Sequence, residues 1–452
     1  MSSVTDVARA LDGLDPARIE RARWFAGKGR GIAALHLADA LPIPDLVDAY
    51  LLLVDISYRD EGPGERYLMP AYVSGAGHVW EPRIGEGFWE ALMAAMRAGG
   101  ELPGIHGLFE LRPNALLTQE PSMFGERALG VDQSNTSVIL GERVVLKAYR
   151  LLATGEHPEV ELGRALEHAH YPHVPAFAGS LHHLDGEGRE TALAIVQRFV
   201  PDSIDPWEGM AAQLGRLIAG TQKSSLKAAT EEIAEIGRIA GGLHVALARE
   251  LGTRRATAED LHRWRTAADR QLDLALATID GDAGAELKAL EPRIRAGLAA
   301  FEHVEPPLLS RTHGDLHWGQ FLRSPSGVHV VDFEGEPTRS IDERRRPASP
   351  MRDLACLVRS LDHVARMAEL RAAGVAKQGL NVDAWIEKAQ ERCIEAYRAA
   401  IADSDTGLEF DPALLRAFEL EKETYEFLYA ARFLPSWLYA PRLGMRWLFR
   451  HG

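Results

Sequence analysis

The sequence predicts an α+β protein in which a strand-rich N-terminal part precedes a mostly helical C-terminal part. Before residue 200, several segments alternate apolar and polar residues with a period of two. After residue 207 the composition becomes rich in Ala, Leu, Glu and Arg, with the helical period. The length of 452 residues exceeds the usual limit for one hydrophobic core, and 46% hydrophobic residues are enough to fill a core in each of two or three units.

The first predicted unit spans residues 1–104. A short helix is expected before RARWFAGKGR (21–30), and the segments YLLLVDISYRD (50–60) and ERYLMPAYV (65–73) flank a Pro/Gly turn, which predicts a β-hairpin. The helical stretch GFWEALMAAMRAGGEL (87–102) and its Gly-Gly pair close this unit.

The second predicted unit, residues 105–200, is a small sheet with one helix. SVILGERVVLKAYR (137–150) predicts a hairpin around Gly141-Glu142, HPEVELGRALEHA (157–169) predicts a helix, and TALAIVQRFV (191–200) predicts an apolar strand. The third unit, 201–452, is expected to hold long helices over most of 207–300 and 352–440, which the segment 311–337 interrupts as loop, strand and loop.

Charge and cysteine content exclude several classes of protein. The net charge of −14 argues against a surface that binds nucleic acid. Cys356 and Cys393 are too few for a disulfide framework, the N-terminus does not have the pattern of a signal peptide, and no stretch of eighteen apolar residues occurs. We therefore expect a cytoplasmic protein with a small-molecule substrate, no nucleic-acid partner and no membrane partner.

The segment RTHGDLHWGQFLRSPSGVHVVDFEGEP (311–337) carries the chemistry. Asp332 at the end of a strand and the amide of Gln320 are oxygen ligands of the kind that Mg²⁺ prefers. Asp315 would then accept a proton from a substrate hydroxyl while Gln320 and Asp332 hold the metal on ATP. The alternative is an acidic surface loop whose Asp binds backbone amides.

Phosphoryl transfer also needs a cation on the phosphates. Lys147 ends a β-branched run, and Glu161, fourteen residues on, begins a helix from which it could pair with that lysine. No Gly-rich phosphate loop precedes the strand; the turn before it holds the polar residues Ser134, Asn135, Thr136 and Ser137, which can present hydroxyls and N–H groups to phosphates. An ordinary polar hairpin turn is the alternative.

HGDLHWGQ, DFEGEP and SPMRDLA resemble the aminoglycoside-phosphotransferase-like kinases, and the resemblance is strongest to the maltokinases and the related actinobacterial glucosamine kinases. It covers most of the chain. The resemblance implies a bilobal protein-kinase-like fold, with an N-terminal α+β cap at 1–104, a strand-rich nucleotide-binding lobe at 105–200 and a mostly helical C-terminal lobe at 201–452. It also implies ATP and Mg²⁺ as cofactors.

The same resemblance assigns roles to single residues. Asp315 is the catalytic base, Gln320 and Asp332 bind metal, Lys147 binds the α- and β-phosphates and Glu161 pairs with it. The adenine-binding hinge holds Gln197, Phe199 and Val200. The residues expected at the acceptor sugar are Asp315, His317, Trp318, Glu334, Lys422, Tyr425 and Glu426.

Two of these assignments have structural alternatives. Trp318 is equally suited to a core, and the glutamates of 419–426 also fit a solvated helix face. Asp353 and His313 are expected to support the catalytic loop rather than to touch substrate.

The predicted function is therefore ATP-dependent phosphorylation of a sugar hydroxyl. Glucosamine is favoured over maltose, because the Glu-rich wall suits an ammonium group. A maltokinase, an aminoglycoside phosphotransferase and a nucleotide-binding module without turnover are the alternatives.

Overall fold

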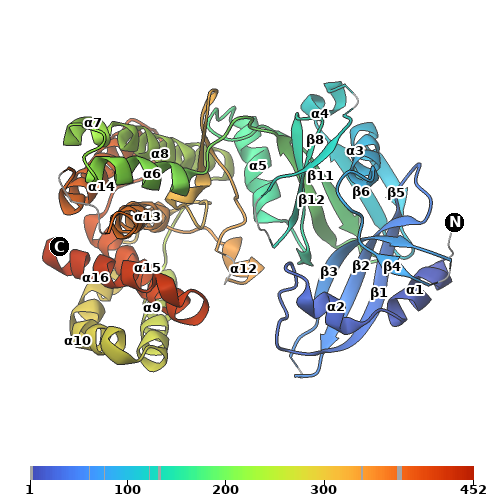
Figure 1. The fold of residues 1–452 in the computed structure, drawn as a ribbon, viewed down its shortest axis with the longest axis horizontal. Coiled ribbons are helices and arrows are strands. Elements are labelled where there is room, and N and C mark those ends of the chain that lie inside the picture. Colours follow the sequence, from blue (N-terminus) through green and yellow to red (C-terminus); the bar gives the residue numbers. More distant parts are fainter. Residues whose placement is uncertain are drawn as a thin grey trace. The chain divides into compact units, whose positions relative to one another are not determined.

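The computed structural model describes residues 4–60, 62–75, 77–121, 123–130, 134–336, 339–373 and 379–451. The chain divides into two compact units, the first made of residues 1–167 and 175–201 and the second of residues 168–174 and 202–452. The first unit contains all the larger sheets and the second is mainly helical, as Figure 1 shows by the arrows and the coils. Each unit is described by itself.

Two antiparallel sheets form the first unit. One has the order β1 (Ile32–Pro42), β2 (Ala49–Tyr58), β3 (Glu65–Val73) and β10 (Leu151–Leu152), with β4 (Val79–Trp80) also on β3. The other has the order β5 (Gly100–Pro103), β6 (Leu108–Pro113), β11 (Phe177–Leu184), β12 (Glu190–Arg198), β9 (Val144–Ala148), β8 (Thr136–Leu140) and β7 (Glu126–Ala128). The helices of this unit are α1 (Val4–Asp12), α2 (Pro16–Arg21), α3 (Phe88–Ala98), α4 (Ala115–Gln119) and α5 (Pro158–His168).

The predicted hairpin of 50–60 and 65–73 is confirmed as β2 and β3, with Leu53 opposite Leu68. Strand β2 is buried on both faces, because Leu51 and Leu53 pack into one core while Leu52 and Val54 pack into another, next to α1 and α2. A strand that is covered on both sides is expected to read as a continuous apolar run, as LLLV does here.

The hairpin around Gly141-Glu142 is also confirmed, with Val138 of β8 opposite Leu146 of β9. Both turn residues have positive φ, 57° and 54°, which is the geometry of a tight hairpin turn. Strands β5 and β6, on either side of the predicted boundary at residue 104, pair with each other in the larger sheet. The three-part division of the chain stays a prediction.

The second unit consists of packed helices, as predicted for 207–300 and 352–440. They are α6 (Pro206–Ile218), α7 (Leu226–Ala229), α8 (Glu231–Leu251), α9 (Ala258–Thr278), α10 (Gly281–Leu298), α11 (Ala300–His303), α12 (Ile341–Arg344), α13 (Pro350–Arg371), α14 (Val382–Ala402), α15 (Pro412–Phe433) and α16 (Tyr439–His451), with the 3₁₀ turns η1 (Trp318–Gln320) and η2 (Pro435–Trp437). Two short hairpins, β13 (Arg254–Arg255) with β14 (Leu308–Leu309) and β15 (Phe321–Ser324) with β16 (Gly327–Val330), lie among them. Within the described ranges, no helix has the length and apolar character needed to span a membrane.

Candidate active site

The first turn of helix α13 holds the loop that carries Asp315 through hydrogen bonds. Ser349 caps this helix, Pro350 begins it, and Asp353 in its first turn accepts hydrogen bonds from the backbone N–H groups of His313 (2.7 Å) and Gly314 (2.9 Å). His244 approaches the same carboxylate with its Nε2 at 3.1 Å. The prediction that Asp353 braces the catalytic loop is therefore confirmed.

The two halves of the 311–337 motif are tied to each other. His313 donates from Nε2 to the carbonyl of Val331 (2.9 Å), and its Nδ1 accepts from the N–H of Asp315 (3.3 Å). Gly314 has φ +88°, and a Cβ on it would lie 3.1 Å from the Cα of Gly335. Only glycine permits both that backbone conformation and that close approach, so the loop and the turn after β16 are fixed side by side.

Asp315 lies beside a buried cation and a thiol. Its Oδ1 is 3.5 Å from Lys422 Nζ, and the Cys356 thiol donates to the same oxygen at 3.6 Å. Burial is the largest single effect and by itself would raise the pKa of Asp315, but the ammonium of Lys422 together with His317 and His313 outweighs burial and holds this pKa below its usual value. Burial raises the pKa of Cys356 well above its usual value, so the thiol keeps its proton and remains a donor.

The second oxygen of Asp315 has no partner among the described residues. A cavity of about 20 Å³ borders this carboxylate, with Lys422, Tyr425 and Cys356 in its wall. That volume is close to what one water or one hydroxyl occupies. Asp315 is thus an ionised carboxylate with one oxygen held in place and the other available to a hydroxyl group.

Gln320 and Asp332 converge, as the metal prediction requires. The amide nitrogen of Gln320 is 3.5 Å from Asp332 Oδ2, and a half-turn of that amide would direct its oxygen to the same point. Gln320 is buried, whereas Asp332 is exposed and has φ +66°, a conformation that is uncommon for a residue other than glycine. One carboxylate and one amide oxygen on an accessible edge fit Mg²⁺, which keeps several waters.

The structure gives Lys147 a partner other than the predicted Glu161. Its ammonium lies 3.0 Å from Glu159, and Tyr149 also donates to Glu159 (3.0 Å). Residues two positions apart point to nearly opposite sides of a helix, so only one of these glutamates can face strand β9. Lys147 in that strand and Tyr149 just after its end are two positions apart, so both point to the same side. Both side chains contact Glu159, which is 1% exposed.

The polar residues before β8 are partly committed to the protein itself. Asn135 accepts from the backbone N–H of Arg150 (3.0 Å), and Thr136 accepts from its Nε (2.7 Å). Thr136 and Ser137 belong to strand β8, so only Ser134 and Asn135 lie in the turn that was predicted to hold all four residues. Their contact with phosphates stays a prediction.

The predicted hinge lies at the end of strand β12. Gln197 is still paired in the sheet, and Val200 is buried. The N–H of Phe199 donates to the carbonyl of Arg143 (2.8 Å), so this amide is not available as a donor to adenine. The role of these residues in nucleotide binding stays a prediction.

The glutamates of helix α15 are not a solvated face. Glu419, Glu421 and Glu423 are 9%, 4% and 0% exposed. Glu423 is 2.6 Å from the buried guanidinium of Arg359, and Glu421 is 2.7 Å from that of Arg352. Buried carboxylates persist when a cation compensates them, and here neighbouring helices supply the cations.

Glu426 differs from these glutamates. Its Oε1 is 3.1 Å from Lys422, and its other oxygen has no partner in the part of the chain that the structure describes. Tyr425 lies under the ammonium of Lys422, with Nζ 4.7 Å from the ring centre. The structure thus brings three of the predicted acceptor residues, Lys422, Tyr425 and Glu426, next to one another, and Lys422 connects them to Asp315.

Other predicted acceptor residues have structural partners. Trp318 is 5% exposed and donates from Nε1 to the carbonyl of Pro206 (2.7 Å), so its ring packs into the core, and its contact with a sugar stays a prediction. His317 begins η1 and accepts from the N–H of Gly319 (3.0 Å). Burial lowers the pKa of His317, so the ring is neutral at pH 7. Glu334 is half-buried in the turn after Asp332, and its sugar contact stays a prediction.

Comparison with known proteins identifies the family. The model of the maltokinase N-terminal cap domain matches residues 19–83. A glucosamine kinase of Streptacidiphilus jiangxiensis is 34% identical over 414 residues, which cover 90% of this chain and 92% of the relative. The chain belongs to the glucosamine kinase family. A second member, the glucosamine kinase of Mycolicibacterium smegmatis, is 30% identical over 88% of this chain and 99% of its own length.

Solved structures of glucosamine kinases have the same fold. One crystal form superimposes with a TM-score of 0.80 at 30% identity and covers 98% of this chain and 99% of the other. A complex of a glucosamine kinase with glucosamine, ADP and inorganic phosphate superimposes with a TM-score of 0.76, also at 30% identity, over 97% of this chain and 98% of the other. The predicted protein-kinase-like α+β fold and the resemblance to this family are confirmed.

Proposed function

We propose that this protein is an ATP-dependent glucosamine kinase, which transfers the γ-phosphoryl group of ATP to a hydroxyl of the sugar. The observation that carries the proposal is membership of the glucosamine kinase family at 34% identity over 90% of the chain. The geometry around Asp315 agrees with it, because a fixed, ionised carboxylate beside a space of hydroxyl size is what a general base for an alcohol requires.

In this proposal the carboxylate oxygen Oδ2 of Asp315 accepts the proton of the attacking hydroxyl. Lys422 and Cys356 hold Oδ1 and thereby fix the direction of the free oxygen. Lys422 also keeps the carboxylate ionised at neutral pH by lowering the pKa of Asp315. A base that is already deprotonated and oriented needs no reorganisation when the hydroxyl arrives.

Lys147 and the metal ligands act on the nucleotide. Glu159 fixes the ammonium of Lys147, which we assign to the α- and β-phosphates of ATP. Gln320 and Asp332 are the residues that would hold Mg²⁺. When it is bound, the metal neutralises charge on the phosphates.

We assign recognition of the amino group to Glu426. Glu419, Glu421 and Glu423 are compensated by arginines of the fold, whereas among the described residues Glu426 has only the ammonium of Lys422 as a partner and keeps one oxygen unpaired. A carboxylate with spare acceptor capacity beside the catalytic base suits an ammonium group. A neutral sugar leaves that oxygen without a donor. Its kcat/KM should therefore fall by a larger factor than the loss of one methylene contact would cause.

A coupled ADP-release screen over glucosamine, maltose, glucose, N-acetylglucosamine and kanamycin tests the proposal. Glucosamine should give the highest kcat/KM, and glucose and N-acetylglucosamine should be poor substrates. Glu426→Gln should narrow the preference for glucosamine over glucose, while Glu391→Gln, whose carboxylate pairs with Lys388 at 2.6 Å, should leave it unchanged. If maltose gives the highest kcat/KM instead, the protein is a maltokinase.

A second test concerns the base. Asp315→Asn should lower kcat by roughly two to four orders of magnitude and leave ATP affinity within a few-fold, because the residue acts on the acceptor. Near-normal turnover in this variant would remove Asp315 from the mechanism.

A further inference from the structure

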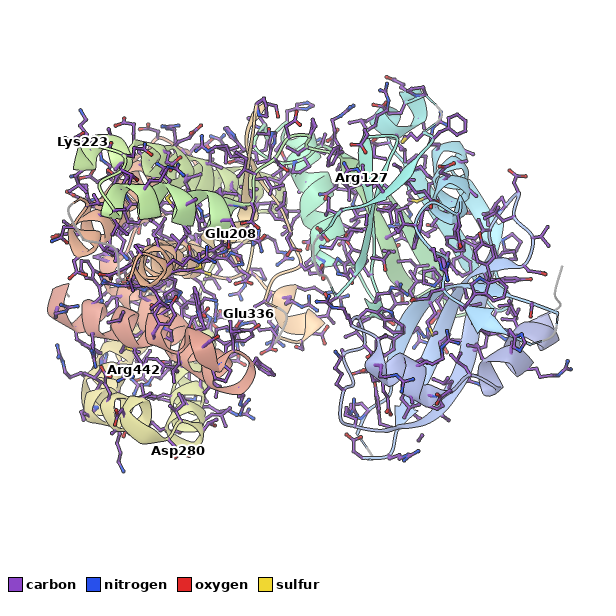
Figure 2. The ribbon with its side chains drawn as sticks, in the orientation of Figure 1. Arg127, Glu208, Lys223, Asp280, Glu336 and Arg442 are labelled. Atoms are coloured by element: carbon purple, nitrogen blue, oxygen red, sulfur yellow. The ribbon has the colours of Figure 1, made fainter. Side chains whose placement is uncertain are left out.

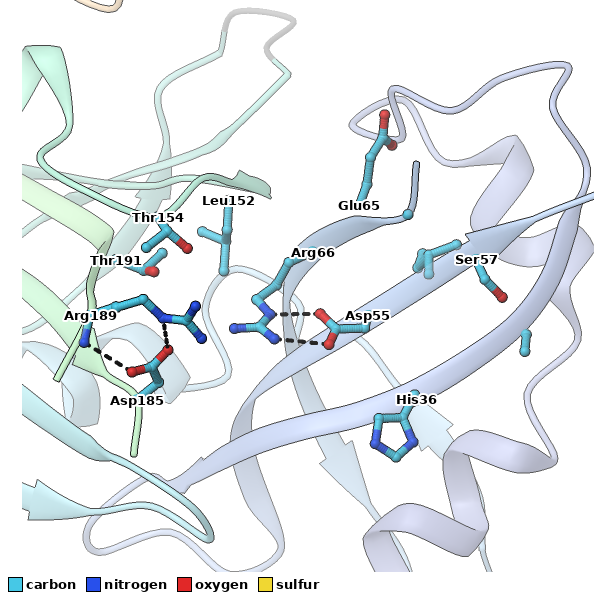
Figure 3. A pocket seen from close by; sticks show the side chains of 13 residues that line it. His36, Asp55, Ser57, Glu65, Arg66, Leu152, Thr154, Asp185, Arg189 and Thr191 are labelled. Carbon is cyan, nitrogen blue, oxygen red and sulfur yellow. Dashed lines mark hydrogen bonds and ion pairs between the residues drawn. The ribbon is translucent and has the colours of Figure 1, made fainter. Parts of the chain in front are cut away.

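A pocket of about 490 Å³ lies in the first unit, and none of the residues that line it is assigned to the phosphotransfer reaction (Figure 3). One wall consists of strands β1, β2 and β3, which contribute His36, Asp55 and Arg66. The other wall consists of the β11–β12 turn and the start of β12, which contribute Asp185, Arg189 and Thr191. Its volume is that of a site for a small organic molecule.

Two arginines of this pocket are held in fixed positions. Arg66 donates from Nε and Nη2 to the two oxygens of Asp55, at 2.6 and 2.9 Å. Arg189 donates from Nε to Asp185 at 2.8 Å, and Asp185 is itself fixed by the backbone N–H groups of Glu187 (3.0 Å) and Arg189 (2.9 Å). Such hydrogen bonds orient a guanidinium group before any ligand binds.

Each of these guanidinium groups keeps an unused donor. Nη1 of Arg66 and Nη2 of Arg189 have no acceptor within the ranges that the structure describes. In Figure 3 the two guanidinium groups point toward one another, and each carboxylate lies on the outer side of its own arginine. Because the carboxylates are already engaged, the remaining hydrogen-bonding capacity between the arginines is that of donors.

The order of charges across the pocket is carboxylate, guanidinium, guanidinium, carboxylate, and Glu187 adds a further carboxylate 3.3 Å from Nη1 of Arg189. Two like charges are therefore adjacent in the middle: the hydrogen bond to Asp185 raises the pKa of Arg189, and the positive charge of Arg66 opposes part of that rise. An anion between the arginines would make the charges alternate, whereas a cation would lie against two positive groups. The third carboxylate that lines the pocket, Glu65, is occupied by Arg30 and by the hydroxyl of Tyr67.

We propose that this pocket binds a small molecule through a phosphoryl group held between Arg66 and Arg189. A guanidinium N–H group forms a charge-assisted hydrogen bond with a phosphate oxygen, and the unused donors of the two arginines can take different oxygens of one phosphate. The pocket is larger than one phosphate, and the hydroxyls of Ser57 and Thr191 line the rest of it. A sugar phosphate uses both parts of the pocket, while free phosphate uses only the arginines.

Isothermal titration of the full-length protein with glucose 6-phosphate, inorganic phosphate and glucose tests the proposal without turnover. Glucose 6-phosphate should bind and glucose should not. Arg66→Gln and Arg189→Gln should each weaken the binding of glucose 6-phosphate about tenfold or more, because each removes a charge-assisted contact. Inorganic phosphate that binds as tightly as glucose 6-phosphate would identify free phosphate as the ligand, and weaker binding would identify the sugar phosphate.

Arg127→Gln is the matched control. This arginine (Figure 2) belongs to the same unit and forms a two-point contact with Glu142 (2.7 Å each) outside the pocket, so its loss should not change binding. The side chain of Arg189 is 61% exposed, so Arg189→Gln should fold even if Arg66→Gln does not, and thermal unfolding checks both variants. Titrations in which glucose 6-phosphate binds equally to Arg189→Gln and to the unchanged protein, or in which it does not bind to the unchanged protein, would overturn the proposal.

Discussion

Replacement of Lys422 by Met should move the acid limb of the pH–rate profile to higher pH. The carboxylate of Asp315 must be deprotonated to accept a proton, and the ammonium of Lys422 keeps it so by lowering the pKa of Asp315 against the effect of burial. Methionine has a similar length but no charge, so only His317 and His313 still oppose the effect of burial and the pKa of Asp315 rises. Activity should then be lost at a higher pH as the solution is acidified.

The size of this effect follows from the distance of 3.5 Å between Lys422 Nζ and Asp315 Oδ1. With an effective dielectric constant of about 20, two unit charges at that distance interact by about 5 kcal/mol, which is an upper limit because water and Glu426 share the ammonium. Since about 1.4 kcal/mol corresponds to one pH unit, the limb should move upward by at least about one unit and by no more than about three and a half.

The assay is kcat/KM for glucosamine at saturating ATP, measured over about pH 4 to 9, because this ratio reports the ionisation of the free enzyme. Lys422→Arg keeps the positive charge and should leave the limb in place. Lys388→Met removes an ammonium that pairs with Glu391 at 2.6 Å on helix α14 and should change nothing. An acid limb that coincides in Lys422→Met and the unchanged protein, even at a reduced rate, would refute the role of Lys422 in setting the charge of Asp315.

Three further predictions concern the supports of the site. Glu159→Gln removes the charge that fixes Lys147, and we expect KM for ATP to rise several-fold in the ADP-release assay. An unchanged KM would mean that the Lys147–Glu159 ion pair serves the stability of the fold and not ATP binding. Asp353→Asn weakens two hydrogen bonds to the catalytic loop, which should lower the free energy of unfolding by about 2 to 4 kcal/mol in urea titrations and lower kcat as well. A normal kcat in Asp353→Asn would show that these two hydrogen bonds stabilise the fold but do not contribute to catalysis. Arg150→Met should raise KM for ATP more than it lowers kcat, because the polar turn before β8 loses its anchor, and equal changes in both constants would contradict this.

Features that depend on neighbours in the sequence were predictable from it. The hairpin of β8 and β9 has both a turn signal and alternating residues, and both are local. The strands β1 and β11 were missed because IAALHLADALP and FAGSLHHL contain Ala, Gly, Ser, Asp and His, which are not typical of strands. In β11 the polar side chains are nevertheless buried, and His183 bonds to Asp39 at 2.8 Å from a distant strand.

The candidate site was predictable to the same extent. Asp315, Gln320 and Asp332 lie in one short segment, so the motif itself brings them together. The partner of Lys147 depends on which side of helix α5 faces strand β9, and spacing alone did not distinguish Glu159 from Glu161. The sequence alone suggested that the glutamates of α15 face solvent, because the arginines that pair with them come from another helix, α13.

Residues 147–152 couple the sheet of β1, β2, β3 and β10 to strand β9, which carries Lys147. Lys147 and Tyr149 face Glu159, and the next residue, Arg150, reaches both ways: it anchors Asn135 and Thr136 before and within β8, and it lies over the ring of Trp24 (4.9 Å) and 2.7 Å from Glu81. Immediately afterwards, β10 pairs with β3 of that sheet. Just after Lys147, the chain is therefore tied to the N-terminal sheet by the pairing of β10 with β3, and to Trp24 and Glu81 beside that sheet by a ring contact and an ion pair. A shift of the sheet would therefore also move the strand that holds the lysine. The geometry of a hairpin alone would not provide this, and we infer that the N-terminal sheet serves to hold Lys147 and the turn before β8 in register.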